Sequence, residues 1–188
     1  MVTVQETTAA LGSVVRIAMF DRAAVTGFGR DAAACRRSFW AYVIGLPIIL
    51  LLTGLQVSGT NTETPELLAT AQLLAQIIEA AGLPLLLIPV LRRFGRADRW
   101  AWFVTSYNWF TLGQIVLSVA VLGLVGGLPI TALRLTLGAV NVYTLVVEAF
   151  LADAVLDIGG ARAAMIVLLD VFLSFGVNRL ADWIGGGA

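Results

Sequence analysis

The sequence predicts an all-α fold, a polytopic membrane protein built as a bundle of about five transmembrane helices with an amphipathic interfacial helix at its N-terminus. Apolar residues make up 59% of the 188 positions and charged residues 13%, against about 45–50% and 25% in soluble proteins. Five mostly apolar segments are each about 20 residues long, enough to cross a bilayer. Arginines gather in alternate connections between these segments, a distribution typical of membrane proteins.

Residues 1–37 are expected to form a cytoplasmic N-terminal segment with a helix over residues 8–24. One face of this helix is apolar and carries Leu11, Val14, Val15 and Ala18. Two interpretations are compatible with this pattern: the helix lies in the membrane surface with Arg16 and Arg22 at the phosphates, or it packs on the rest of the protein. Glu6 precedes the first arginine and no basic stretch leads an apolar run, so a cleaved signal peptide is not expected.

Residues 38–184 are expected to form the transmembrane domain. Its five spans are predicted at about 38–57, 66–91, 100–124, 130–156 and 162–183. Trp40 and Trp100 near span ends are typical of the aromatic belt at a membrane surface, and Pro47 is expected to kink the first span. Thr64-Pro65-Glu66 is a helix-start pattern, with the Thr64 hydroxyl as N-cap and the proline at the first helical position.

Seven arginines are expected to form a basic collar at one membrane surface. They are Arg30, Arg36, Arg37, Arg92, Arg93, Arg96 and Arg99, before the first span and between the second and third. The connections after the first and third spans, the former at residues 58–66, contain no arginine. The positive-inside rule therefore predicts a bacterial inner-membrane protein with its N-terminus in the cytoplasm and, after five spans, its C-terminus in the periplasm.

The residue types that the chain lacks exclude several kinds of site. It has no histidine, so imidazole-ligated haem, histidine metal sites and histidine general bases are excluded. Cys35 is the single cysteine and cannot form an internal disulfide or hold an iron–sulfur cluster. Twelve basic and twelve acidic residues argue against a nucleic-acid partner. No nucleophile and base occur at a motif spacing, so neither an enzyme nor a bound cofactor or metal is expected.

Polar residues recur at helical spacing inside four of the spans, which places each set on one helix face. The sets are Gln72, Gln76 and Glu79; Tyr107, Thr111, Gln114 and Ser118; Arg134, Asn141 and Glu148; and Asp170, Ser174 and Asn178. Charged residues inside a bilayer usually face the bundle interior. At about 1.5 Å per residue, Tyr107, Glu148 and Asp170 come to one level, so two carboxyl groups that face each other there would share a proton.

We therefore expect an intramembrane polar cluster. Its members are Glu79, Tyr107, Asn108, Gln114, Asn141, Glu148 and Asp170. One interpretation is a proton or cation site built from Glu148, Asp170 and Glu79. The other is packing through interhelical hydrogen bonds, each worth about 0.6 kcal/mol, and this is the interpretation favoured for the amide and tyrosine members.

Three stretches of the sequence carry a family resemblance. They are RRSFWAYVIGLP at 36–47, GLPLLLIPVLRRFGRADRWAWFVTSYNW at 82–109 and ARAAMIVLLDVFLSFGVNRLADW at 161–183. The chain resembles alphaproteobacterial inner-membrane proteins that are distantly similar to the Yip (Rab-interacting) family, over about residues 10–184. The resemblance implies a five-helix bundle with a cytoplasmic N-terminus and no particular activity. Glu79 and Glu148 match no position of that family.

Two functions are compatible with these features. The first is a non-catalytic membrane scaffold or accessory subunit that docks against a larger membrane protein complex, with lipids bound around it. Short connections favour it, and so do Ala71/Ala75 and Gly123/Gly127, small residues four apart that permit close helix packing within the bundle or against a partner. The alternative is a small proton- or cation-coupled transporter or channel that uses the intramembrane carboxylates. It requires a water-accessible cavity that reaches at least one of them.

Overall fold

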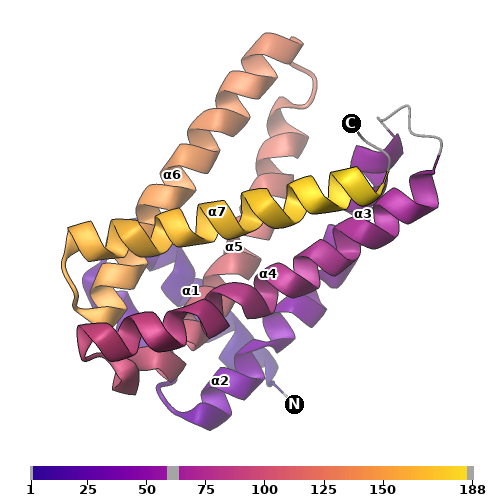
Figure 1. Cartoon of the computed structure of the whole chain (residues 1–188). Coiled ribbons are helices and arrows are strands. Elements are labelled where there is room, and N and C mark those ends of the chain that lie inside the picture. Colours follow the sequence, from indigo (N-terminus) through magenta and orange to yellow (C-terminus); the bar gives the residue numbers. More distant parts are fainter. Residues whose placement is uncertain (1, 59–63, 186–188) are drawn as a thin grey trace.

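The computed structural model describes residues 2–58 and 64–185, except for the side chain of Gln56. These residues form helices and no strand, which confirms the all-α prediction (Figure 1). The elements are α1 (Val4–Ala18), the 3-10 helix η1 (Arg22–Gly27), α2 (Ala32–Ser38), α3 (Trp40–Ser58), α4 (Pro65–Phe94), the 3-10 helix η2 (Ala97–Arg99), α5 (Trp100–Val125), α6 (Ile130–Leu156) and α7 (Gly160–Ile184). Five stretches, one of them made of α2 and α3 together, are long and apolar enough to cross a membrane. Most of the arginine-free connection after the first span, at 59–63, and the last residues, 186–188, lie outside the described residues.

The ends of α4 show one confirmed and one wrong prediction. Pro65 occupies the first helical position, as the helix-start pattern predicts. The Thr64 hydroxyl does not cap the helix; it donates instead to the carbonyl oxygen of Gly185 at 3.0 Å, which ties the start of α4 to the end of α7. At the other end, Gly95 adopts a left-handed conformation with φ 66° and its N–H donates to the carbonyl oxygen of Arg92.

The N-terminal helix α1 is shifted from its predicted position at 8–24. It begins at Val4 because the Thr3 hydroxyl accepts a hydrogen bond from the backbone N–H of Glu6 at 3.1 Å and so caps the first turn. It ends at Ala18, and Phe20 then adopts φ 61°, a left-handed conformation that turns the chain into η1. The two ends of this helix are therefore determined by a side-chain cap and a backbone turn, and not by the extent of its apolar periodicity.

The position of α1 agrees with the second of its two interpretations, because the helix packs on the protein itself. Val14 and Ile17 are buried against α5 and α6. Gly113 of α5 permits this approach, since a Cβ there would lie 2.6 Å from Cγ1 of Val14. The Tyr143 hydroxyl of α6 donates to the carbonyl oxygen of Ala18 and holds the end of α1 in place.

The transmembrane helices form two groups that diverge toward one end. α4 and α7 run side by side, with Ala71 and Ala75 packed against Ala181, so one predicted small-residue pair does serve close packing (Figure 1). α5 and α6 contact each other, and α6 points away from α7 and α4 beyond the turn that joins it to α7 (Figure 1). At the far end of this second pair Leu124 is 84% exposed and Leu135 is 71% exposed.

The packed core lies at the arginine-rich end of the bundle. Leu87 and Leu91 near the end of α4, Phe103 near the start of α5, and Leu151 and Val155 near the end of α6 are all fully buried in one cluster. The turns between α4 and α5 and between α6 and α7 close this end. A polar site between the helices is therefore sealed on the arginine-rich side, while the two helix groups separate on the other.

Candidate functional site

Asp170 of α7 lies at the centre of the polar interior. The Tyr107 hydroxyl of α5 donates to Oδ1 of Asp170 at 3.0 Å. The Glu148 side chain of α6 also comes within hydrogen-bonding reach of Asp170. Glu148 is 2% exposed, and its Oε1 has no hydrogen-bond partner among the described residues. The three residues predicted at one level do meet, and the two carboxyl groups face each other.

Asn108, one residue along from Tyr107, forms a separate buried junction between α5 and the first span. Its Nδ2 donates to Oγ of Ser38 at 2.9 Å, and its Oδ1 accepts a longer bond from the Tyr42 hydroxyl at 3.4 Å. Ser38 in turn donates to the carbonyl oxygen of Cys35 at 2.8 Å. Because the Asn108 carboxamide has a protein partner at each end, packing accounts for its burial.

Glu79 of α4 joins the polar interior along the contact between α4 and α7. Nδ2 of Asn178 donates to Oε1 of Glu79 at 2.6 Å, and further along the same contact Nε2 of Gln72 donates to Oδ1 of Asp182 at 2.9 Å. The charges of Glu79 and Asp170 are close enough to interact. The polar stripes of α4 and α7 thus face each other, and the acidic interior extends from α6 through α7 to α4.

Acidic groups in this interior have neutral partners. In residues 2–58 and 64–185, no arginine forms an ion pair with Glu79, Glu148 or Asp170. Arg134 shares α6 with Glu148 but is exposed about four turns away. Nor does the described part of the chain contain a group of three acidic, histidine or cysteine side chains that could hold a metal ion. The hydrogen-bond donors to Glu79 and Asp170 described in this interior are therefore neutral side chains, Asn178 and Tyr107.

Gln114 and Asn141 are not brought to Asp170; they line a separate polar cleft between α3, α5 and α6. The cleft has a volume of about 420 Å³. Its lining residues are Leu52, Thr111, Gln114, Ile115, Ser118, Leu137, Val140, Asn141 and Thr144. Thr144 lies one helical turn from Glu148, so the cleft reaches close to the carboxyl pair without exposing it. The residues of the predicted polar cluster therefore lie in three places: around Asp170, at the Asn108 junction and in this cleft.

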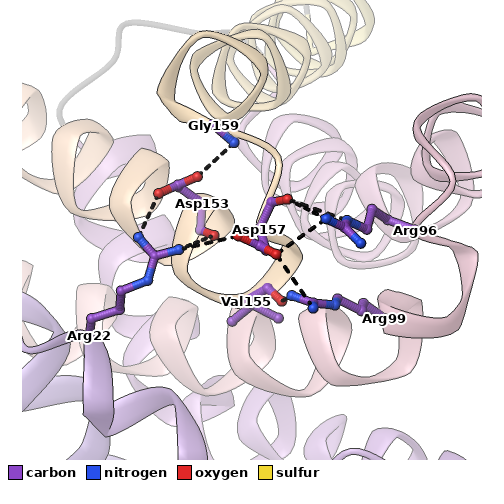
Figure 2. A network of polar contacts seen from close by, with 7 residues as sticks. All are labelled: Arg22, Arg96, Arg99, Asp153, Val155, Asp157 and Gly159. Atoms are coloured by element: carbon purple, nitrogen blue, oxygen red, sulfur yellow. Dashed lines mark hydrogen bonds and ion pairs between the residues drawn. The ribbon is translucent and has the colours of Figure 1, made fainter.

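The connection between α6 and α7 is fixed by three arginines of the arginine-rich end (Figure 2). Arg96 donates to the carbonyl oxygen of Asp157 at 3.0 Å and to its carboxylate at 3.2 Å. Arg99 lies 3.6 Å from the same carboxylate and donates to the carbonyl oxygen of Val155 at 3.0 Å. Arg22 of η1 pairs with Oδ2 of Asp153 at 2.9 Å. Asp157 itself has φ 54°, a left-handed conformation that ends α6.

The remaining arginines of the predicted basic collar divide by their contacts. Arg37 pairs with Glu6 at 3.0 Å and so links α2 to α1, and Arg30 stacks over the ring of Trp102 at 4.0 Å. Three others are exposed and form no ion pair within the described ranges: Arg36, Arg92 and Arg93. The collar is therefore partly a set of internal ion pairs and partly a free basic surface.

Comparison with known proteins adds no family to this description. No family model matches the chain, and no curated protein or solved structure is significantly similar to it. The resemblance to the Yip family stays a prediction.

Sequence reasoning missed several partners in these sites. Tyr42 is absent from the predicted cluster, although its hydroxyl donates to Asn108 and it lies near Asp170. Asp182, one turn beyond Asn178, continues the polar stripe of α7 and its spacing could have identified it. Asp153 and Asp157 carry no such signal, because their pairing with arginines depends on how the chain turns between α6 and α7.

Proposed function

We propose that this chain is a small proton-coupled transport protein of a membrane. The observation that carries the proposal is the facing pair of Glu148 and Asp170, which has no arginine beside it in the described part of the chain. Two carboxyl groups within hydrogen-bonding reach favour one shared proton, because two negative charges would repel strongly at low dielectric. A proton that such a pair takes up and releases is what couples transport to a pH gradient.

The neighbours of the pair support this role. On one flank, Glu79 is close enough to Asp170 for their charges to interact, and it reaches the contact between α4 and α7. On the other flank, Thr144 lines the polar cleft one turn from Glu148. Ionisable groups enclosed between helices and flanked by polar groups are typical of intramembrane proton relays.

The proposed setting is a bacterial inner membrane with the N-terminus in the cytoplasm and the C-terminus in the periplasm. Support comes from Arg36, Arg92 and Arg93, which are exposed at the arginine-rich end without an ion pair among the described residues. Such arginines are typical of the cytoplasmic side, where they can contact lipid phosphates.

The test is proton entry into liposomes that contain the purified protein and a trapped pH-sensitive dye. On lowering the external pH, we expect the wild-type protein to acidify the interior faster than empty liposomes do. Asp170→Asn and Glu148→Gln each remove one carboxyl of the pair while keeping its size, so proton entry should fall to the rate of empty liposomes. Size-exclusion chromatography and circular dichroism check that the variants fold.

Asp182→Asn is the matched control for this experiment. Asp182 is also a carboxyl group of α7, but it bonds Gln72 and lies three turns beyond Asp170. Its replacement should leave proton entry unchanged. Wild-type proton entry no faster than that of empty liposomes would contradict the proposal, as would folded Asp170→Asn and Glu148→Gln variants that admit protons like the wild type.

A second candidate is the scaffold or accessory subunit, favoured by the exposed end of α5. A Cβ on Gly123 or Gly127 would meet nothing within 4 Å in the described structure, so a helix of another protein could approach the backbone there. Purification of a tagged chain from native membranes in mild detergent should then retain a stoichiometric membrane partner that the Gly123→Leu variant loses. A chain that purifies alone would argue against this function.

A further inference from the structure

Two carboxamides line the cleft between α3, α5 and α6 without a hydrogen-bond partner of their own. Gln114 belongs to α5 and Asn141 to α6, and neither side chain bonds to another described residue. Both lie about two turns beyond Tyr107 and Glu148, on the side away from the arginine-rich end. An amide without a partner at membrane depth is costly, so water or a solute has to provide the missing bonds.

The other polar groups of the cleft already have partners. The hydroxyls of Thr111, Ser118 and Thr144 each donate to a carbonyl oxygen of their own helix, at 2.8–3.0 Å. Their oxygens still accept hydrogen bonds. The cleft therefore offers a solute two complete carboxamides, which donate and accept, together with three hydroxyl acceptors.

Charge is absent from the walls of the cleft. None of its lining residues is acidic or basic, and the carboxyl group of Glu148, one helical turn from Thr144, is 2% exposed. A charged solute would give up its hydration here and find no opposite charge in return. A neutral solute with hydroxyl or amide groups exchanges its water contacts for the carboxamides at little cost.

The volume of the cleft and its apolar lining residues further restrict the class of solute that it can bind. Its volume of about 420 Å³ is far larger than one water molecule, whose share of liquid volume is about 30 Å³, and falls within the range of small-ligand sites. Leu52, Ile115, Leu137 and Val140 supply an apolar surface beside the carboxamides. Such a lining suits a carbon chain that carries polar groups along one side.

We propose that this cleft binds a small uncharged polyol, held between Gln114 and Asn141. The inference rests on the proposed transport function, to which it adds the class of the transported solute. The solute sits about two turns from Glu148 at the level of the carboxamides, and Thr144 lies between the two sites. Solute occupancy and protonation of the carboxyl pair can therefore influence each other along the two turns of α6 between Asn141 and Glu148.

The test is equilibrium binding of radiolabelled glycerol, xylitol and sorbitol to the purified full-length protein in detergent, with radiolabelled choline as a charged comparison. We expect saturable binding of at least one polyol and none of choline. Asn141→Leu and Gln114→Met keep the size of each side chain but remove its hydrogen bonds, so each should abolish polyol binding. Gln76→Met makes the same change on α4, outside the cleft, and should leave binding at the wild-type level.

Binding and proton entry together separate the two proposals. In one outcome the wild-type protein binds a polyol, Asn141→Leu does not, and the wild-type protein admits no protons. This result would support the polyol site and overturn proton coupling. Proton entry that depends on Asp170, without binding of any of the three polyols, would overturn the polyol site and leave the transport proposal standing. Equal polyol binding to the wild type and to both cleft variants would also overturn it. Because two variants on different helices are used, misfolding of one leaves the test intact.

Discussion

The arginine-rich end and the membrane interior treat their carboxylates in opposite ways. At the arginine-rich end the side chains of Asp153 and Asp157 are 23% and 57% exposed, and both pair with arginines. In the interior Glu148 is 2% exposed and faces a second carboxyl group, that of Asp170. Carboxyl groups are thus paired with arginines at one end and have no arginine partner among the described residues in the interior.

The difference indicates which carboxylates serve structure alone. Exposed ion pairs contribute about 0–1 kcal/mol each, so the pairs of Asp157 with Arg96 and Arg99 orient the turn between α6 and α7 more than they stabilise it. An acidic pair inside a membrane is costly, and this cost is what supports the proposed role for the proton of Glu148 and Asp170. A lost hydrogen bond costs most in the buried interior, so the largest effects of substitution are expected there.

The largest effect is expected for Asn108→Leu. Asn108 is fully buried, and its loss leaves the Ser38 hydroxyl without a donor and the Tyr42 hydroxyl without an acceptor. Two broken buried hydrogen bonds should lower the free energy of unfolding by about 2–3 kcal/mol. The measurement is unfolding of the purified protein in mixed micelles, followed by tryptophan fluorescence.

Asn141→Leu is the control for this substitution, because it makes the same chemical change at an exposed carboxamide with no partner among the described residues. It should change the free energy of unfolding by less than about 0.5 kcal/mol. If both substitutions lower the free energy of unfolding by the same amount, the two hydrogen bonds of Asn108 do not stabilise the packing of α5 on the first span.

Tyr107→Phe should have the next largest effect. It removes the hydroxyl that donates to Asp170 at 3.0 Å and leaves a partly buried acceptor unsatisfied, at a cost of about 1–2 kcal/mol. In an Asp170→Leu background, which has no acceptor left, the same change should cost less, because the two substitutions remove one interaction. A double-mutant cycle of unfolding free energies measures this coupling. Strictly additive costs would contradict the bond.

The common depth of Tyr107 and Asp170 in the membrane could be predicted, because depth along a span depends on helix geometry alone. Tyr107 and Asp170 lie on different spans but at the same distance from the arginine-rich end, and the rise per residue is enough to bring them together. Long apolar segments and their turns likewise followed from the length needed to cross a membrane. Both arguments need only local periodicity and one boundary.

The separation of Gln114 and Asn141 from Asp170 could not be predicted in this way. They share helix faces with Tyr107 and Glu148, yet α6 diverges from α7, so residues further along lose contact with α7 (Figure 1). Crossing angles depend on the packing of both helices, such as the buried contact of Phe103 with its neighbours, which no single segment specifies.

Asp157→Asn tests the exposed side of the contrast and should have a small effect. Asparagine tolerates the left-handed conformation at this position, so the substitution removes charge without adding backbone strain. The loss in unfolding free energy should be about 0.5–1 kcal/mol in low salt and less in about 0.5 M NaCl, because exposed ion pairs are screened. Asp98→Asn is the control, since Asp98 is exposed without an ion pair in the described part of the chain. A loss unaffected by salt would contradict the interpretation.

The smallest effect is expected at Asp21, where a single arginine faces a surface carboxylate. The Arg16 guanidinium, 2.6 Å from Oδ2 of Asp21, lowers the pKa of that carboxyl group below its usual value. Because the pKa of Asp21 is lower in the folded state than in the unfolded state, the ionised side chain stabilises the fold at pH values above the unfolded pKa of about 3.9. This stabilisation is lost as the pH falls through the pKa of the folded state. The difference in thermal midpoint between wild type and Asp21→Asn should therefore be constant near neutral pH and shrink in acid. A difference that stays the same into acid would show that Arg16 does not stabilise the charged form, and the contrast between the two regions would then hold only for the clustered arginines.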